Sequence, residues 1–389
     1  MSQMDAPHHD LDALLRLMVE HKASDLFITV ALPPSMKIDG VIRMLSREAM
    51  TPQQVRELVL SALTPRQQQE FTHSHECNIA ISRTGLGRFR LSAFQQRGQL
   101  GMVLRRIESK IPSVQELHLP PVLQKLSMLK RGLILIVGGT GAGKSSTMAA
   151  MIDYRNRNDN GHILTIEDPI EYLHTHQKCI VTQREVGIDT ESYEVALRNA
   201  LRQAPNVITI GEIRCADTMD YAIAFAESGH LCLATLHANT ANQALERIIH
   251  FFSEERARQL LMDLSLNLKA VVAQQLIPTK DGNSRRVVTE VMVLTPMIAD
   301  LILKGKIHEL KEVMAKPNQE GMRTFDQSLY ELYREGAISR ESALAHADSP
   351  SQLRLLMKLD KEYDVSTSSG SLSEITLQEV DTPEGWSPR

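Results

Sequence analysis

Apolar positions in the first hundred residues follow two different periods. From Leu11 to Glu20 they recur every three to four residues, which predicts a helix. The later apolar runs are short and predict strands, at residues 25–30, 36–44, 77–81, 88–94 and 100–107. An Asp-Gly pair at 39–40 predicts a hairpin turn, and the Thr-Pro pairs at 51–52 and 64–65 each predict the start of a helix. We therefore expect a small α+β domain over residues 1–108.

Strands and helices alternate regularly in the middle of the chain. Strand-like runs at 133–137, 162–166, 207–210 and 231–235 are separated by helix-like segments at 145–154, 193–202 and 219–228. This order is typical of a parallel sheet covered by helices, which carries ligand-binding loops at the carboxyl ends of its strands. The preceding stretch, 109–121, contains three prolines and is expected to be a linker. The α/β core is therefore expected at residues 122–252.

The pattern changes after Phe252. A long amphipathic helix is expected from Ser253 through Gln275, followed by a strand at 286–294 and short helices at 296–304, 324–334, 339–347 and 351–359. We expect these elements to form a helical C-terminal subdomain over residues 253–364. The last segment, 365–389, is rich in Ser, Thr, Glu and Pro without apolar periodicity, and is expected to be disordered.

Composition narrows the class of protein. The 389 residues, 42% hydrophobic and 23% charged, suit two or three globular domains. No apolar run approaches the length of a membrane span, and the first residues lack the regions of a signal peptide, so a cytoplasmic chain is expected. Four widely spaced cysteines predict neither a disulfide framework nor a cysteine zinc site. The net charge of −4 gives no reason to expect nucleic acid.

A glycine-rich loop follows the apolar run that ends at Val137. It fits the pattern G-x-x-x-x-G-K-[ST] between a strand and a helix. The residues expected to bind a nucleotide are Gly138, Gly139, Thr140, Gly141, Ala142, Gly143, Lys144, Ser145 and Ser146. Glycines let backbone N–H groups approach phosphate oxygens, and Lys144 supplies a charge for the β- and γ-phosphates. The Ser145 hydroxyl is suited to ligate Mg²⁺.

Carboxylates at two other strand ends are candidates for placing the attacking water or for holding Mg²⁺. Glu212 follows the run that ends at Ile210, in the position of a Walker B acid, although Gly211 replaces the usual preceding aspartate. Alternatively, Glu212 only caps the next helix. Glu167 and Asp168 end another strand and offer oxygen ligands, but a solvated acidic turn explains them equally well.

Histidines and arginines supply further candidates. His237 follows the strand at 231–235, where it is placed to contact a γ-phosphate, although a lone histidine is more often structural. Arginines of the first domain offer a cation for the transferring phosphoryl group, but exposed arginines are usually only solvated. They are Arg88, Arg90, Arg97, Arg105 and Arg106. A metal site at His174 and His176, with Glu171 and Cys179, is disfavoured because two histidines two positions apart on a loop are weak evidence.

Together these motifs resemble the secretion ATPases of the GspE superfamily, and most of all the PilT and PilU retraction ATPases of type IV pili. The similarity runs from about residue 23 to about residue 359 and is carried by GGTGAGKSS, TIEDPIEYLH, QREVGIDTESYEVALRNALRQAPNVITIGEIR and ESGHLCLATLHANTANQALERI. It implies a PAS-like N-terminal domain joined to a RecA-like ATPase domain, in a hexameric ring that binds ATP and Mg²⁺. Glu212 would be the catalytic glutamate, Glu167 part of the acidic site and His237 the histidine nearest the γ-phosphate. Arg90 and Arg105 match positions of arginine fingers.

Two departures indicate the branch of the family. Residues 295–305 lack the Ala-Ile-Arg-Asn-Leu-Ile-Arg signature of PilT proteins, and together with ALRQAP and the Ser/Glu-rich tail they look like the PilU branch. Gly139, where the family usually has proline, and Asn206, where it has an acid, remove no phosphate ligand.

The resemblance implies an accessory motor for pilus retraction and twitching motility. It would act with a PilT-type ATPase on a PilC-type platform protein at the cytoplasmic side of the inner membrane. An alternative is a nucleotide-binding regulatory or scaffolding subunit that co-assembles with an active motor. A nucleic-acid translocase is disfavoured by the acidic charge and by the lack of a basic, aromatic-rich groove.

Overall fold

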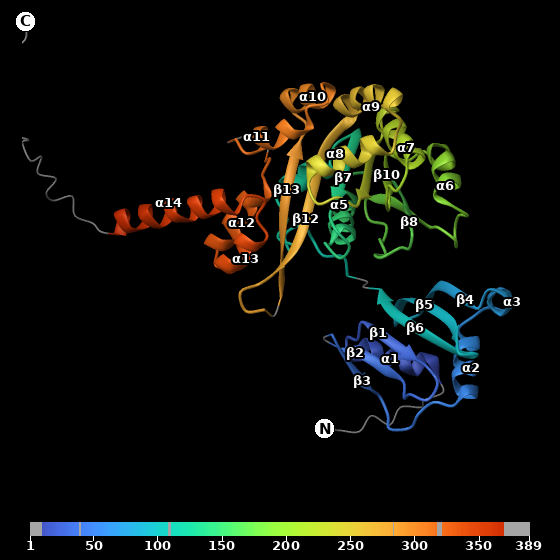
Figure 1. Ribbon diagram of the computed structural model, residues 1–389. Coiled ribbons are helices and arrows are strands. Elements are labelled where there is room, and N and C mark those ends of the chain that lie inside the picture. Colours follow the sequence, from blue (N-terminus) through green and yellow to red (C-terminus); the bar gives the residue numbers. More distant parts are fainter. Residues whose placement is uncertain (1–9, 39, 108–109, 283, 317–320, 369–389) are drawn as a thin grey trace, which may run out of the picture.

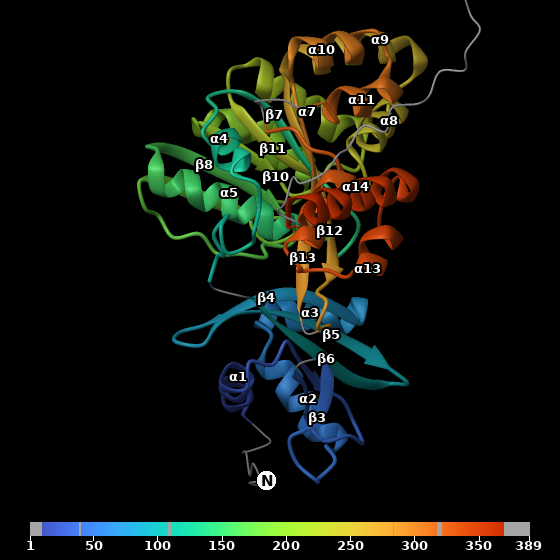
Figure 2. The same ribbon diagram turned by 90° about the vertical axis from the view of Figure 1, so that its left-hand side faces the viewer.

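The computed structural model describes residues 10–38, 40–107, 110–282, 284–316 and 321–368, and these form an N-terminal unit and a larger α/β unit (Figure 1). In both views the N-terminal unit lies below the larger one (Figure 2). The segment between them, the expected linker, has neither helix nor strand from residue 110 to residue 121. Within these ranges no helix has the length and apolar character needed to span a bilayer.

The N-terminal unit is built on an antiparallel sheet. Its strands, within the described residues, are β1 (Asp25–Ile28), β2 (Ser35–Ile38), β3 (Val41–Met44), β4 (Glu76–Arg83), β5 (Gly87–Gln96) and β6 (Gln99–Ile107). Their order is β3-β2-β1-β6-β5-β4, and every neighbouring pair is antiparallel. The predicted pairing of β2 with β3 is confirmed, while position 39 of the turn lies outside the described residues.

In the described part of the N-terminal unit, three helices accompany the sheet. They are α1 (Leu11–Glu20), α2 (Pro52–Ser61) and α3 (Pro65–Ser74). The helix predicted at 11–20 has the expected bounds, and its leucines and Met18 are buried against the sheet. Thr51 and Thr64 both form capping boxes with the glutamine three residues on, because each threonine hydroxyl accepts from the N3 amide. The predicted helix starts are therefore confirmed.

The larger unit is built on a mixed sheet. Its strands in the described part of the chain are β7 (Gly132–Val137), β8 (Gly161–Glu167), β9 (Cys179–Glu185), β10 (Val207–Ile210), β11 (Leu231–Leu236), β12 (Leu268–Pro278) and β13 (Arg285–Val293). The order is β13-β12-β7-β11-β10-β8-β9. All neighbours are parallel except β13, which pairs antiparallel with β12. The predicted parallel sheet is confirmed.

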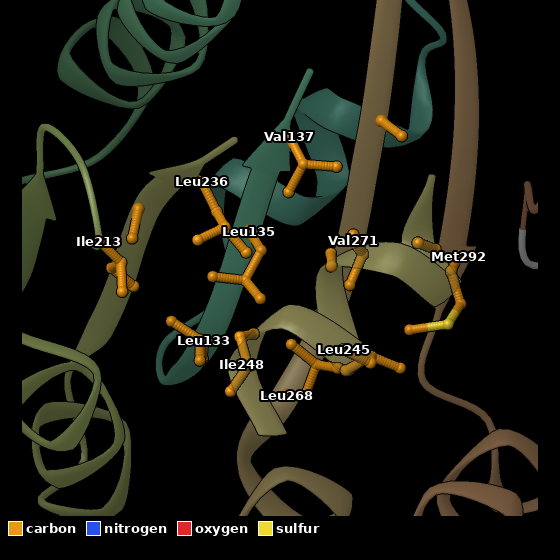
Figure 3. Packing of buried hydrophobic residues seen from close by; sticks show 14 of the residues in the cluster. Leu133, Leu135, Val137, Ile213, Leu236, Leu245, Ile248, Leu268, Val271 and Met292 are labelled. Carbon is orange, nitrogen blue, oxygen red and sulfur yellow. The ribbon is translucent and has the colours of Figure 1, made fainter. Parts of the chain in front are cut away.

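Helices cover both faces of this sheet. They are α4 (Val122–Ser127), α5 (Lys144–Asn158), α6 (Tyr193–Ala200), α7 (Ala216–Glu227), α8 (Ala241–His250), α9 (Glu254–Asn267), α10 (Pro296–Leu303), α11 (Leu310–Met314), α12 (Phe325–Arg334), α13 (Arg340–Ala345) and α14 (Pro350–Ser368). Short 3₁₀ helices lie at Leu201–Gln203 and Ile307–Glu309. Leu133, Leu135 and Val137 of β7 face the core that also contains Leu245 and Ile248 of α8 (Figure 3). The alternate residues of β7 face α4 and α5, so this strand is buried on both sides.

The helix expected from residue 253 through Gln275 is wrong in its second half. α9 ends at Asn267, and β12 follows directly and pairs with β7. The run from 270 to 273 is Ala-Val-Val-Ala, and such small and β-branched residues suit a strand buried on both faces. As a consequence, the boundary expected after residue 252 divides a unit whose sheet continues through β13.

Other boundaries differ less. β9, α4, α8 and α11 were not anticipated from the sequence, whereas the strand near 286–294 and the helices near 296–304, 324–334 and 339–347 lie within a few residues of their expected places. α14 begins as expected but continues through Ser368, into the segment expected to be disordered. The remainder of that expected tail, 369–389, lies outside the described residues.

Candidate active site

The loop between β7 and α5 is shaped to receive an anion. Gly141 and Gly143 have φ values of +76° and +88°, in the left-handed region that glycine adopts without strain. Gly143 is the N-cap of the 15-residue α5, and no side chain caps this helix end. The first N–H groups of a long helix are therefore available at the loop, where the positive end of the helix dipole favours a phosphate.

Lys144 lies folded over this loop. Its Nζ donates to the carbonyl oxygens of Gly138 and Gly139, both at 2.9 Å. Partial burial lowers the pKa of Lys144, while the carboxylates of Glu212 and Glu171 oppose that shift. The ammonium group is thus held by the loop and lies within the field of two acidic side chains.

A cavity of about 420 Å³ gathers the ends of neighbouring parallel strands. Residues 140–146 follow β7, Glu167 ends β8, Glu212 follows β10, and His237 follows β11, and all of them line this cavity. The carboxyl ends of parallel strands meet at one edge of a sheet, so residues almost a hundred positions apart share one space. The predicted site residues of this unit therefore lie together, and their individual roles stay predictions.

Glu212 is fixed by two neighbours. Its Oε2 accepts from Arg214 Nε at 2.8 Å, and its Oε1 lies 3.1 Å from His237 Nε2. The bond to Glu212 raises the pKa of Arg214. The next helix, α7, has Cys215 as its N-cap and no side-chain cap, so the alternative that Glu212 merely caps this helix is not supported. The carboxylate instead points to the cavity beside the histidine.

Gly211 has no room for the aspartate that usually precedes the catalytic acid. A Cβ atom at this position would lie 2.6 Å from the Tyr193 hydroxyl oxygen and 3.2 Å from the Glu167 Cα. Contacts of that length would force a shift of the backbone or of Tyr193. The space that an aspartate would need is therefore taken by Tyr193 and Glu167.

Glu167 is a half-buried carboxyl group that is held by hydrogen bonds rather than freely solvated. Its Oε1 accepts from Thr165 Oγ1 at 2.7 Å and from Gln183 Nε2 at 3.1 Å. Burial raises the pKa of Glu167, and these hydrogen bonds oppose the shift. Asp168 lines the same cavity. This placement favours a part in the site over the alternative of a surface turn.

The arginines predicted as fingers do not line the cavity of their own chain. Arg90 and Arg105 are register partners on β5 and β6 of the N-terminal sheet, and Arg105 Nε donates to Asp25 Oδ1 at 2.8 Å. Arg88 reaches the larger unit instead, where its Nη2 donates to Glu185 Oε2 at 2.6 Å at the end of β9.

Several cavity residues were missed from the sequence. Tyr193 and Tyr172 line the cavity, and the Tyr172 hydroxyl lies 2.7 Å from Ser146 Oγ. His174, which had been weighed as a metal ligand, lines the same cavity, and burial lowers its pKa to about 4. Leu276 and Arg285 enter from the β12–β13 hairpin. The sequence predicts a helix up to Gln275, just before Leu276, and therefore gives no sign that β12 forms this side of the cavity.

Comparisons with known proteins agree with this geometry. The family model of type II/IV secretion system proteins matches residues 4–345. The type IV pilus ATPase PilU of Pseudomonas aeruginosa is 59% identical over 372 residues, which are 96% of this chain and 97% of that protein. The type IV pilus retraction ATPase PilT of the same bacterium is 38% identical over 341 residues, 88% of this chain and 99% of that protein.

A solved structure has the same fold. The crystal structure of the pilus retraction motor PilT with bound ADP matches with a TM-score of 0.84 at 38% identity, over 89% of this chain and 99% of that one. The chain therefore belongs to the type II/IV secretion system protein family, in which it is a PilU-like type IV pilus ATPase related to the PilT retraction motor.

Proposed function

We propose that this ATPase is an accessory motor, which hydrolyses ATP in the cavity at the carboxyl ends of β7, β8, β10 and β11 and retracts pili together with a PilT-type ATPase. The observation that carries the proposal is the convergence of Lys144, Glu212 and His237 on one cavity. The similarity to PilU over nearly the whole chain supports the accessory role.

The residues of the chain divide the work of phosphoryl transfer. The N–H groups of the loop and Lys144 bind the β- and γ-phosphates, and Lys144 then exchanges two carbonyl partners for phosphate oxygens. Glu212 orients the attacking water and receives its proton. Arg214 and His237 hold the carboxylate so that little reorientation is needed.

Mg²⁺ fits the residues at this site. Within the described residues no group of three His, Cys, Asp or Glu side chains is arranged to hold a metal by itself. This suits Mg²⁺, which is usually held by one or two protein oxygens together with nucleotide phosphates. The Ser145 hydroxyl and the carboxylate of Glu167 line the cavity and would hold the ion directly or through water. Bound there, Mg²⁺ would neutralise charge that develops on the phosphates.

The complete site requires a neighbouring subunit in this proposal. Arg90 and Arg105 lie on the N-terminal sheet and outside the cavity of their own chain. In a homohexameric ring, the PAS-like N-terminal domain of one subunit would close on the RecA-like ATPase domain of the next and bring an arginine finger to the γ-phosphate. The linker at 109–121 and the C-terminal helices would then move as the ring hydrolyses ATP. The ring would act on a PilC-type platform protein at the cytoplasmic face of the inner membrane, without nucleic acid.

The variant Glu212→Gln tests the assigned chemistry. An amide keeps the size of the carboxylate but cannot accept the proton of water, so ATP turnover of the purified variant should fall by about 100-fold or more while nucleotide binding is retained. The matched control is Glu191→Gln, which changes an exposed glutamate and should turn over ATP like the wild type. Undiminished turnover in Glu212→Gln would refute the role of Glu212.

Pilus number and twitching motility of mutant strains distinguish an active motor from a scaffolding subunit. The test uses a strain in which pilus retraction depends on this ATPase. In that strain, Glu212→Gln should leave extra pili on the surface and reduce twitching, as deletion of the gene does. A scaffold needs only the folded chain, so normal twitching of the Glu212→Gln strain beside a defective null strain would favour the scaffolding alternative.

A further inference from the structure

The side chain of a glutamine on β12, Gln274, contacts the glycine-rich loop between β7 and α5. Gln274 is 1% exposed, and its Nε2 donates to the carbonyl oxygen of Ala142 at 2.6 Å. The bond joins residues 132 positions apart in the sequence. A buried amide is unfavourable unless its polar atoms are bonded, so this contact fixes the loop and the strand against each other.

Gln274 also lies against two glycines of the loop. A Cβ atom at Gly143 would lie 3.1 Å from Gln274 Nε2, and one at Gly138 would lie 2.7 Å from the Gln274 carbonyl oxygen. The residue therefore contacts the loop near both of its ends. Loop residues 140–146 line the cavity and Gln274 does not, so Gln274 supports the loop from outside the cavity lining.

The other side-chain atom of Gln274 has no partner. Its Oε1 is buried and accepts no hydrogen bond from the described residues. The orientation of the amide is set by Ala142, because a carbonyl oxygen needs a donor opposite it. An unsatisfied buried acceptor is destabilising, and a methionine of similar size would not carry one. Gln274 thus places an unpaired acceptor, Oε1, next to a loop that is rich in N–H groups.

We propose that Gln274 is a positioning residue for ATP hydrolysis, which holds the loop in its phosphate-binding shape through Ala142 and offers Oε1 to a loop N–H when nucleotide binds. The proposal rests on the proposed function, because it assumes that this loop binds the phosphates of ATP. Gln274 itself touches no phosphate. It acts through the backbone of residues 138–143.

A pair of neighbouring glutamines gives the test. Gln274→Met removes the amide at nearly constant volume, and Gln275→Met makes the same change at the adjacent, half-buried position of β12. The fluorescent nucleotide mant-ATP should bind Gln274→Met about 10-fold more weakly, which corresponds to about 1.4 kcal/mol. The KM for ATP should rise by a similar factor with kcat changed much less. The melting temperature should change little, because Gln274→Met removes the unpaired Oε1 but also leaves the Ala142 carbonyl oxygen without its donor. Gln275→Met should behave like the wild type.

Two further variants sharpen the result. Gln274→Glu places an acceptor against the Ala142 carbonyl, so its affinity for mant-ATP should be lower than that of Gln274→Met. Gln274→Asn withdraws the amide by one methylene group and should raise the KM in the same direction. Wild-type affinity and KM in both Gln274→Met and Gln274→Asn would overturn the positioning role. If mant-ATP binds Lys144→Ala like the wild type, the proposed nucleotide site itself is wrong, and this outcome is distinct from failure of the Gln274 proposal.

Discussion

The two sheets of this molecule handle their polar residues in opposite ways. In the mixed sheet, parallel strands bring Lys144, Glu167, Glu212 and His237 to one cavity although they come from four separate strand ends. In the N-terminal sheet, the arginines lie along antiparallel strands and bond locally or to the neighbouring unit. One sheet therefore gathers its candidate residues within the chain, whereas in the proposed ring the arginines of the other sheet would act on a neighbouring subunit.

The environments of the charged groups differ in the same way. Burial raises the pKa of Glu167 and lowers that of Lys144, so the groups in the cavity are held where their charge is costly. The Arg105 side chain is 69% exposed although its partner Asp25 is buried. Buried groups with shifted pKa values are typical of functional sites. An exposed arginine such as Arg105, by contrast, is free to change its partner, as the proposed finger would have to.

The largest expected effect is on ATP turnover, when an arginine of the N-terminal sheet is removed. Arg90→Ala or Arg105→Ala should lower the kcat for ATP by about 1000-fold if that arginine acts as a finger, with nucleotide binding to the single chain unchanged. Arg43→Ala, which changes an exposed arginine of β3 in the same sheet, is the matched control and should keep wild-type turnover. Steady-state ATPase assays at a concentration that supports the ring give the comparison.

Mixing two inactive variants tests whether the arginine acts between subunits. Glu212→Gln subunits retain both arginines, and Arg90→Ala or Arg105→Ala subunits retain the catalytic glutamate. Mixed rings should therefore contain some complete sites and regain part of the turnover. An arginine that acts only within its own chain predicts no recovery.

A second prediction concerns the contact between the two units. Arg88→Ala leaves Glu185 buried without its cation and should lower the free energy of unfolding by about 3–5 kcal/mol. Arg83→Ala, which removes a more exposed pair with Asp12, should cost at most about 1 kcal/mol. Urea unfolding followed by circular dichroism measures both. Equal small losses would mean that the ion pair does not join the units.

The smallest expected effect depends on pH and lies in the mixed sheet. Burial raises the pKa of Glu290 to about 7, although its Oε1 accepts from the Ala241 amide at the start of α8. The folded state must hold this charge as pH rises through 7, so the wild type loses stability between pH 5 and 8. Glu290→Gln should thus gain stability relative to the wild type at pH 8, by at most about 3 kcal/mol, and not at pH 5.

Thermal unfolding at several pH values checks this difference. The control Glu246→Gln changes an exposed glutamate of α8 and should leave the pH dependence unaltered. A constant difference between Glu290→Gln and the wild type across this range would contradict the assigned burial effect.

Sequence patterns predicted the elements whose signal is local. The helix at 11–20, the capping boxes at Thr51 and Thr64, and the phosphate-binding loop depend on residues within one or two turns of each other. β12 was missed because a buried strand with both faces apolar has no period of two, and its first residues continue the pattern of α9. The pairing of β12 with β7 on one side and with β13 on the other distinguishes the strand from a continued helix.

The site was predictable to a similar extent. Glu167, Glu212 and His237 follow strands of a parallel sheet, and this topology was enough to expect them near the loop. The reason for Gly211 was not accessible, because Tyr193 comes from α6 and meets position 211 only in the folded chain. Gln274 was hidden for the same reason, since its contact with Ala142 depends on the order of strands in the sheet.

A crystal structure of the ring with a non-hydrolysable ATP analogue and Mg²⁺ tests the central claim most directly. The account predicts the triphosphate on the N–H groups of residues 138–145, with Lys144 at the γ-phosphate and Glu212 facing the terminal phosphorus atom. A nucleotide bound elsewhere, or a Glu212 carboxylate turned away from the phosphates in every subunit, would contradict it.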